Sequence, residues 1–264
     1  MNPPYVIENG KVRTRSLEAH IVDHCNLRCA LCCSLSPHLP RWHVEPESLA
    51  AELDLAGRVL EPTWFKLVGG EPLLHPRLLD CLAAARGSGI AEIVSLTTNG
   101  FLLPRQPTEF WEQLDALTVS LYPVPALPAE TIALIDARAA EFGVRLNWKH
   151  QDAFVGMDRA ERCGDEEENR EVWSKCWLRR RCHMIRGGRF YACTRPAHFQ
   201  ALLGEDFTTD GVPLHEGPTL AAEIADYLNQ PAPLRACSLC LGGDAPSQPH
   251  RPLRRGEAPA FMPA

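Results

Sequence analysis

The cysteines constrain this chain more than any other feature. Eleven occur in 264 residues, and they form two groups, Cys25 to Cys33 and Cys163 to Cys240, with Cys81 alone between them. Disulfides are rare in a reducing compartment, where clustered cysteines are more often metal ligands or reactive thiols. The first fifteen residues lack the pattern of a signal peptide. We therefore expect a cytoplasmic protein with two separate cysteine sites.

Composition excludes several other classes of protein. Hydrophobic residues make up 45% of the chain and charged residues 23%, which is the balance of a folded globular protein. No apolar run approaches the roughly 18 residues of a membrane span, so we expect no membrane association. The net charge is −6 and no basic block occurs, which argues against a nucleic-acid partner.

Strand-like and helix-like stretches alternate over about the first 150 residues. Short apolar strands that alternate with helices of ten or more residues are typical of βαβ units and a parallel sheet. The pattern indicates a partial barrel or an open α/β sheet, in which ligands lie beyond the carboxyl ends of the strands. The predicted strands are 17–22, 64–68, 93–96, 117–121 and 144–148, and the predicted helices are 47–60, 76–87 and 128–142.

Three motifs follow predicted strands directly. They are CNLRCALC at 25–32, GGEP at 69–72 and TTNG at 97–100. Because the carboxyl ends of parallel strands meet at one edge of the sheet, the motifs predict a single active-site face.

The pattern changes after residue 155. Residues 157–175 are polar and charged and are expected to form a loop or lid. Residues 182–193 predict a hairpin that turns at Gly187–Gly188. A helix over 219–229 leads to the Cys237–Cys240 pair, and a Pro- and Arg-rich tail follows.

Cys25, Cys29 and Cys32 form a CxxxCxxC loop. Three thiolates on a short loop suit three irons of a 4Fe–4S cluster and leave the fourth iron open to another ligand. A zinc knuckle is the alternative. Zinc prefers four ligands, so Cys33 or His24 would have to complete that set.

The three motifs resemble those of the radical SAM superfamily, over about residues 16–150. In that family CxxxCxxC follows the first strand of the barrel, GGEP ends the second strand, and a motif like TTNG follows the third. The resemblance implies a partial (β/α) barrel of about six parallel strands with a small C-terminal hairpin-plus-helix iron–sulfur extension. It also implies S-adenosylmethionine on the open iron, cleaved to a 5′-deoxyadenosyl radical that abstracts hydrogen from a substrate.

The resemblance implies roles for residues at the strand ends. Glu71 would accept a hydrogen bond from the methionine ammonium, and the two glycines before it would let the backbone approach the ligand. Asn99 and Ser120 would contact the ribose and carboxylate, although Ser120 is open to a structural role in its strand. Leu31 stands where the family usually has an aromatic residue near adenine. The implied cofactor-binding residues are Leu31, Gly69, Gly70, Glu71, Pro72, Asn99 and Ser120.

The second cysteine group resembles the twitch form of the SPASM-type extension. In that form four cysteines, here Cys176, Cys193, Cys237 and Cys240, hold one auxiliary 4Fe–4S cluster. A structural zinc ribbon built from the same four is the alternative. Cys182 competes with Cys176 for the first position, and family spacing favours Cys176.

Three residues outside the predicted ligand sets could decide which reaction follows hydrogen abstraction. Cys182 and Cys163 flank the predicted hairpin and lid and are candidate hydrogen donors to a substrate radical, although a plain buried or surface thiol is the alternative for each. Lys149 ends the fifth predicted strand and is a candidate base or substrate anchor. An epimerase returns hydrogen from a thiol, whereas a dehydrogenase needs a base and an electron path.

The sequence therefore predicts a radical SAM oxidoreductase or epimerase. It would act on a carbinol carbon of a sugar or aminocyclitol-type small molecule in secondary metabolism, with an external one-electron reductant of the flavodoxin or ferredoxin type. A peptide-modifying radical SAM enzyme and a zinc-stabilised binding module are the alternatives. The predicted division is a core at 1–155, a polar lid or linker at 156–175, a twitch-like domain at 176–243 and a tail at 244–264.

Overall fold

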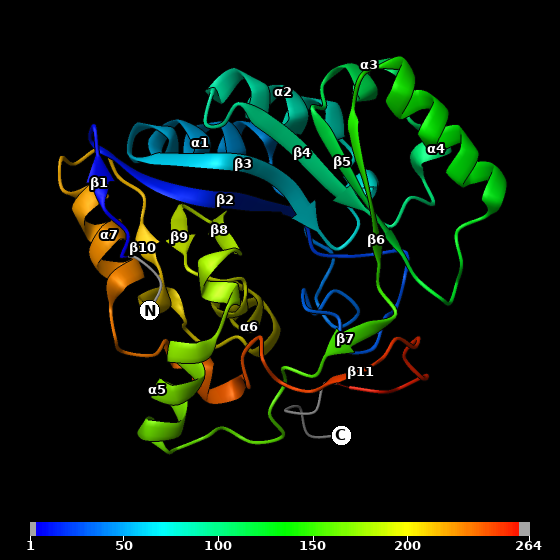
Figure 1. Cartoon of the computed structure of the whole chain (residues 1–264). Helices are drawn as coiled ribbons and strands as arrows, with labels where there is room; N and C mark the ends of the chain where they lie inside the picture. Colours follow the sequence, from blue (N-terminus) through cyan, green and yellow to red (C-terminus); the bar gives the residue numbers. More distant parts are fainter. Residues whose placement is uncertain (1–3, 259–264) are drawn as a thin grey trace.

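The chain folds around one large sheet, which the computed structural model describes over residues 4–258 (Figure 1). Within those residues six parallel strands form its centre, and five of them lie where the alternating pattern predicted strands. The sixth, His183–Arg186, was predicted only as one arm of a hairpin. The architecture is the predicted partial (β/α) barrel. The parallel strands in spatial order are β8 (His183–Arg186), β2 (Lys11–Val22), β3 (Leu60–Gly69), β4 (Ile93–Thr98), β5 (Ala116–Leu121) and β6 (Arg145–His150).

Short antiparallel strands extend the sheet. β9 (Arg189–Tyr191) forms the predicted hairpin with β8, β10 (Val212–Pro213) pairs with β9, and β1 (Ile7–Glu8) pairs with the start of β2. The hairpin turn has positive φ at Gly187 and Gly188 (59° and 71°), a backbone conformation that favours glycine.

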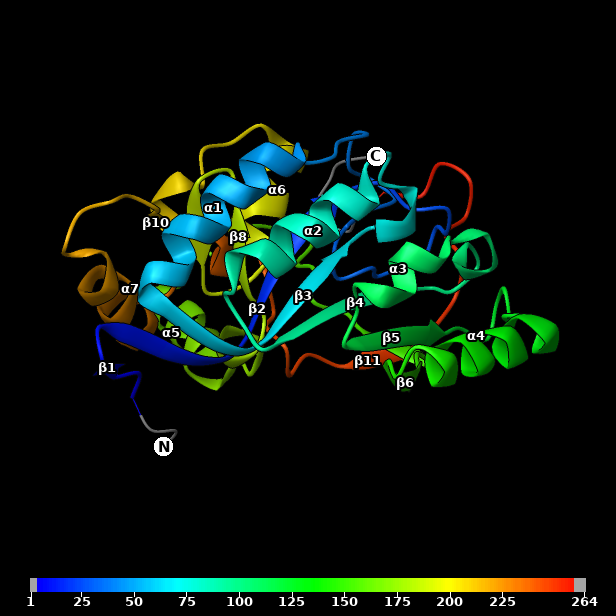
Figure 2. The same cartoon turned by 90° about the horizontal axis from the view of Figure 1, so that it is seen from above.

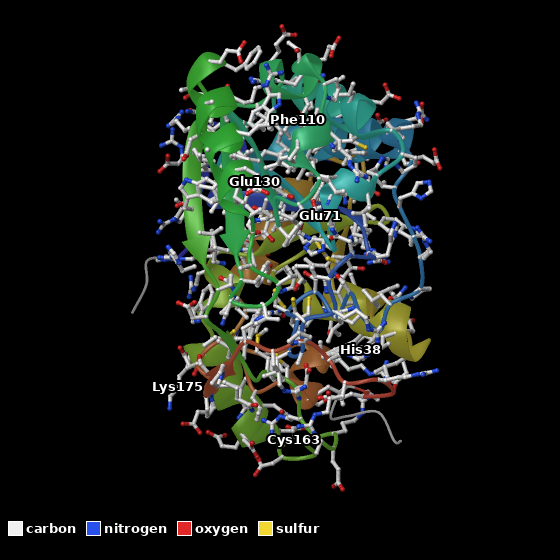
Figure 3. The ribbon with its side chains drawn as sticks, turned by 90° about the vertical axis from the view of Figure 1, so that its right-hand side faces the viewer. His38, Glu71, Phe110, Glu130, Cys163 and Lys175 are labelled. Carbon is white, nitrogen blue, oxygen red and sulfur yellow. The ribbon has the colours of Figure 1, made fainter. Side chains whose placement is uncertain are left out.

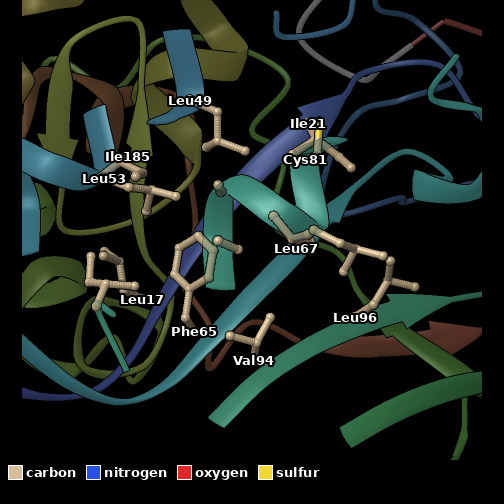
Figure 4. Packing of buried hydrophobic residues seen from close by; sticks show 14 of the residues in the cluster. Leu17, Ile21, Leu49, Leu53, Phe65, Leu67, Cys81, Val94, Leu96 and Ile185 are labelled. Carbon is tan, nitrogen blue, oxygen red and sulfur yellow. The ribbon is translucent and has the colours of Figure 1, made fainter. Parts of the chain in front are cut away.

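Four helices cover one face of this sheet, and they are α1 (Pro46–Val59), α2 (Leu78–Ser88), α3 (Thr108–Glu112) and α4 (Ala129–Glu141) (Figure 2). Leu49 and Leu53 of α1 pack on Leu17 and Phe65 of the strands, and each of these side chains is at most 1% exposed (Figure 4). Such a side chain contributes about 1.5–3 kcal/mol on full burial. Cys81 of α2 lies in the same core.

The opposite face of the sheet, here called the inner face, is polar. Successive strand residues point to opposite faces, so Ser16, Glu18 and His20 of β2 alternate with the core residues Leu17 and Ala19. All three polar side chains are buried, at 3%, 9% and 5% exposure. The inner face is therefore covered by protein on the β2 side rather than left to solvent.

The C-terminal half lies against the β2–β8 side of the sheet (Figure 1). Its helices are α5 (Glu166–Lys175), α6 (Arg195–Leu203) and α7 (Leu220–Asn229), the last close to the prediction. Single 3-10 turns occur at η1 (Pro72–Leu74), η2 (Leu103–Arg105), η3 (Leu178–Arg180), η4 (Thr208–Asp210) and η5 (Arg235–Leu239).

The prediction of a loop over 157–175 was wrong for its second half, which is α5. Asp165 caps the helix by accepting from the amides of Glu167 and Glu168. Asn169 and Trp173, four residues apart, form its buried side. Only one of these two buried residues is apolar, so the sequence pattern is too weak to predict a helix in this charged segment.

The described part of the tail is packed rather than free. β11 (Ser247–Pro249) pairs with β7 (Ala153–Val155), and the two lie side by side in Figure 1. The amide of Ala30 donates to the carbonyl of Arg251 at 2.9 Å, so the tail also contacts the first cysteine loop. Among residues 4–258, no helix is both long enough and apolar enough to cross a bilayer.

Candidate active site

Three thiols of the first group lie together in the loop that follows β2. Cys29 is 8% exposed. The pKa of Cys29 is raised to about 12, first by burial and then by the neighbouring thiols of Cys32, Cys25 and Cys33. Because the thiols oppose one another's ionisation, a bound cation is what would convert them to thiolates together.

The TTNG motif contacts this loop directly. Asn99 Nδ2 donates to Asn26 Oδ1 at 2.7 Å and lies 3.8 Å from Cys25 Sγ, while Asn99 Oδ1 accepts from the Phe101 amide at 3.2 Å. The Leu27 amide also donates to Cys25 Sγ, at 3.3 Å. Asn99 therefore holds the cysteine loop in this structure, and its contact with a ribose stays a prediction.

The backbone of the GGEP motif contacts the residues that lead from β2 into the same loop. The Gly70 amide donates to the Val22 carbonyl at 2.7 Å, and the Glu71 amide donates to the His24 carbonyl at 3.0 Å. A Cβ at Gly69 would lie 2.2 Å from the Val22 oxygen, and one at Gly70 would lie 2.2 Å from the His24 oxygen. The glycines thus permit two backbones to meet, whereas the sequence predicted an approach to the ligand.

Gly70→Ala is expected to displace the cysteine loop, because the added methyl group meets a backbone carbonyl that cannot rotate away. We expect loss of iron from the first cysteine group on anaerobic reconstitution and destabilisation by about 1–3 kcal/mol, measured by iron content and thermal unfolding. Gly87→Ala is the control, since its Cβ meets nothing within 4 Å. A Gly70→Ala protein with wild-type iron content would contradict this account of the loop.

Glu71 links GGEP to TTNG. Its side chain is 1% exposed, and it accepts from Thr98 Oγ1 at 2.6 Å, the Asn99 amide at 2.8 Å and the Leu73 amide at 3.1 Å. Burial raises the pKa of Glu71 to about 7 against these three hydrogen bonds. Glu71 Oε2 accepts one hydrogen bond, from the Asn99 amide. Because a carboxylate oxygen has two lone pairs, Oε2 can accept a second one from the predicted methionine ammonium. Pro72 begins η1 and is buried beside it.

Leu31 and Ser120 have different surroundings. Leu31 has a φ of +58° and lines a cavity of about 320 Å³ together with Cys32 and His38. Ser120 is 6% exposed and hydrogen-bonds to Tyr122, which lowers the pKa of that phenol. Leu31 is therefore free to contact a ligand, whereas Ser120 already has one side-chain partner and its contact with the cofactor stays a prediction.

The sequence did not mark Tyr122, although it borders the cysteine loop. Its pKa is raised by burial and then by the negative charges of Cys29 and Cys32. Its ring stacks on Phe154 at 6.2 Å between centroids and contacts His250 at 5.0 Å. No motif signals these contacts, because they join three segments that are distant in the chain.

The four cysteines of the predicted twitch set are brought together from three segments. The pKa of Cys193 lies well above its ordinary value, first because of burial and then because of Cys237, Cys176 and Cys240. The Gly242–Gly243 turn directs its two amides at Cys240 Sγ and Cys176 Sγ, each at 3.3 Å. Amide donors of this kind stabilise thiolates, so the set suits an anionic thiolate cluster.

Cys182 lies elsewhere, on the inner face. The parallel register of β2 and β8 sets Leu17 opposite His183, which puts Cys182 beside Ser16. The Ser16 hydroxyl donates to the Arg181 carbonyl at 2.6 Å. Cys176 is among the thiols that raise the pKa of Cys193, which favours Cys176 over Cys182, and the ligand assignment stays a prediction.

Charged groups surround Cys182. Lys66 Nζ donates to Glu18 Oε1 at 3.1 Å and to Ser16 Oγ at 3.3 Å. The pKa of Cys182 is raised by burial first and then by Glu18, while the positive charges of Lys66 and Lys149 lower it. Cys182 is therefore close enough to Lys149 to feel its charge, and a shared role for these two predicted residues stays a prediction. Glu18 and Lys66 were missed, although polar Glu18 between Leu17 and Ala19 signals the inner face.

Cys163 is not part of this site. Its amide donates to the Ser238 carbonyl at 2.8 Å and its Sγ lies 3.4 Å from Glu168 Oε2. Figure 3 shows it at the end of the molecule away from Glu71.

The donor chemistry of both cysteine groups fits iron–sulfur clusters, since each is made of thiols alone. Within residues 4–258, no three Cys, His, Asp or Glu side chains converge closely enough to hold one metal ion in common.

Comparison with known proteins gives a consistent assignment. No protein-family model matches the chain. The chain is 30% identical over 155 residues to GTP 3′,8-cyclase of Microcystis aeruginosa, covering 56% of this chain and 44% of that protein. It is 35% identical over 124 residues to GTP 3′,8-cyclase 2 of Mycobacterium bovis, covering 45% and 34%. The chain thus spans less than half the length of these curated relatives.

A solved structure matches almost end to end. BtrN in complex with AdoMet and 2-DOIA superposes with a TM-score of 0.55 at 14% identity, covering 88% of this chain and 94% of BtrN. This match shows the fold, and the three motifs occupy the strand ends that the fold requires. The likeness to GTP 3′,8-cyclases and to BtrN agrees with the resemblance of the three motifs to the radical SAM superfamily. These motifs meet at the carboxyl ends of β2, β3 and β4, where Glu71 and Asn99 connect them.

Proposed function

We propose that the chain is a radical SAM enzyme with two 4Fe–4S clusters that acts on a carbinol carbon of a sugar or aminocyclitol-type small molecule. The observation that carries the proposal is the sorting of the thiols. Three lie at the motif edge, four more come together near the Gly242–Gly243 turn, which bonds two of them, and Cys182 lies on the polar inner face.

Cys25, Cys29 and Cys32 would hold the first cluster. When bound, that cluster and S-adenosylmethionine supply a 5′-deoxyadenosyl radical that abstracts hydrogen from the substrate carbon. Glu71 Oε2 would accept from the methionine ammonium, and Leu31 would present an apolar wall. The buried inner face would exclude water and other hydrogen donors from the radical.

Cys176, Cys193, Cys237 and Cys240 would hold the auxiliary cluster as a twitch-like set. An external one-electron carrier of the flavodoxin or ferredoxin type would supply electrons. The amides of the Gly242–Gly243 turn favour the anionic form of these thiols. A zinc ion on the same four thiols is the competing arrangement, and metal analysis separates the two.

The position of Cys182 favours epimerisation. Its S–H bond would break and the hydrogen atom would form a C–H bond on the substrate face opposite to the abstraction. The resulting Cys182 thiyl radical would take one electron from the external carrier and one proton. Lys66 and Lys149 would bind the hydroxyl groups of the substrate, since they are the positively charged groups around this thiol.

Oxidation of the same carbon is the second candidate. It is favoured by the four-cysteine set, which would accept the electron of a substrate radical, and by the end-to-end likeness to BtrN, whose structure contains AdoMet and 2-DOIA. The substrate radical would then lose a proton to a base, and Lys149 is the base that the sequence predicted.

Turnover in deuterated water tests the proposal. Reconstituted, reduced enzyme would be incubated with S-adenosylmethionine and, separately, with 2-DOIA, a panel of aminocyclitols and aminoglycosides, GTP, and a mixed peptide library. We expect 5′-deoxyadenosine and an aminocyclitol-type product carrying one solvent deuterium at the altered carbon. A product two hydrogens lighter identifies oxidation. Turnover of GTP or of peptides only would overturn the proposed substrate class.

A further inference from the structure

Two buried histidines lie next to Glu18 on the inner face. His20 of β2 is 5% exposed and His198 of α6 is 0% exposed. His198 Nε2 and His20 Nδ1 are 3.2 Å apart, and the rings meet edge to face with centroids 4.7 Å apart. A contact at this distance between two ring nitrogens is a hydrogen bond in which one imidazole donates and the other accepts.

The pair continues toward Cys182. His20 Nε2 lies 4.0 Å from Glu18 Oε2, a gap that one bridging water or a small side-chain rotation closes. Glu18 and Cys182 share the inner face, because β2 residue Ser16 is level with Cys182 and side chains two apart in a strand point the same way. Polar atoms therefore run from α6 to the thiol in the order His198, His20, Glu18, Cys182.

The charge states suit transfer of a proton. Burial, followed by the positive charge of Arg186, lowers the pKa of His20 to about 3. Burial, followed by His20, Arg186 and Arg195, lowers the pKa of His198 well below its ordinary value. Both imidazoles are thus neutral, each with one N–H and one acceptor nitrogen. Burial raises the pKa of Glu18, although the positive charges of Lys66 and Lys149 oppose this shift. The raised pKa makes the protonated form of Glu18 easier to populate.

We propose that His198, His20 and Glu18 form a proton relay that restores the thiol of Cys182 after each turnover. The inference rests on the proposed function, in which Cys182 gives up a hydrogen atom. The thiyl radical takes one electron from the external one-electron carrier and becomes a thiolate. Glu18 then transfers its proton to the sulfur and recovers one from His20 Nε2. His20 Nδ1 takes a proton from His198 Nε2, and His198 Nδ1 takes one in turn. The cycle closes when both rings return to the tautomer with hydrogen on Nε2.

The far end of the relay is open to a donor. His198 Nδ1 is buried and makes no hydrogen bond to any residue within 4–258. A buried ring nitrogen without a protein partner is costly unless a water molecule bonds to it. An ordered water molecule at this nitrogen would supply the incoming proton.

The test separates the first turnover from later ones. His198→Gln and His20→Gln keep one donor and one acceptor but do not transfer protons through a ring. In rapid-quench assays with the aminocyclitol turned over by the wild type, we expect each variant to make about one product per active site at the wild-type rate. Later turnovers would be at least about tenfold slower, in line with the loss of acid–base help.

Controls separate a relay from a structural role. A merely structural defect lowers the burst as well as the steady state, whereas loss of the relay lowers the steady state alone. His215→Gln, whose ring bonds Glu223 far from the inner face, is expected to match the wild type. Iron content and thermal unfolding check the fold of each variant, and the ¹⁵N spectrum of the wild type checks the His20–His198 hydrogen bond itself. If His198→Gln fails to fold, His20→Gln carries the test.

Two results have distinct meanings. Wild-type steady-state rates without a burst in both histidine variants would overturn the relay and leave the proposed function standing. Full turnover by Cys182→Ala, with solvent deuterium still in the product, would overturn the proposed function and the relay with it.

Discussion

Cys182→Ala is expected to retain about eight irons per chain and to form 5′-deoxyadenosine, yet to lose formation of the epimerised product by at least about 100-fold. The thiol lies on the inner face beside Ser16 and Glu18, and it belongs to neither predicted ligand set, so its removal is expected to leave both clusters supported. Without a donor, the substrate radical has no thiol hydrogen to accept. The measurement is product yield by mass spectrometry beside iron and 5′-deoxyadenosine analysis of the same sample.

Cys163→Ala is the matched control for that experiment. Both residues were candidate donors on sequence, but Cys163 contacts Glu168 and Ser238 at the far end of the molecule. We expect it to match the wild type in iron content and product. Loss of irons in Cys182→Ala would instead make Cys182 a cluster ligand and contradict the assignment of Cys176.

Cys29→Ala and Cys193→Ala are expected to remove one cluster each, and so to separate the roles of the two clusters. Each variant should keep about four of eight irons, because each removes a buried ligand from one set only. Cys29→Ala should abolish 5′-deoxyadenosine, whereas Cys193→Ala should still form it without making product. Iron analysis, electron paramagnetic resonance of the reduced proteins and 5′-deoxyadenosine assays check this division.

Two other results would go against two separate clusters. If Cys193→Ala also abolishes 5′-deoxyadenosine at unchanged protein stability, the two sets are not independent. If it keeps all the iron, the four-cysteine set holds none. A variant of Cys81, which lies in the hydrophobic core of α2 with 0% exposure, controls for the general effect of losing a buried thiol.

Much of the fold was predictable because its signals are local. Each motif directly follows a short apolar strand, and glycines such as Gly70 mark places where backbones meet. Parallel strand ends share one edge, so the meeting of CxxxCxxC, GGEP and TTNG followed from their spacing. Glu71, which bonds Thr98 and the Asn99 amide, shows how closely two of these motifs join.

Other parts were not predictable because they depend on contacts between distant segments. β8 was predicted only as one arm of a hairpin, yet it also pairs in parallel with β2, and no local pattern signals that partner. The same pairing brings Cys182 to Glu18. His198 follows no motif, and only the packing of α6 places it on His20.

The reconstituted wild-type protein gives the most direct test of the central claim that this chain is a two-cluster radical SAM enzyme. After anaerobic reconstitution, reduction and addition of S-adenosylmethionine, we predict about eight irons per chain, a brown chromophore and 5′-deoxyadenosine in the quenched mixture. A colourless protein that binds zinc on the Cys176 set, and forms no 5′-deoxyadenosine, would contradict it.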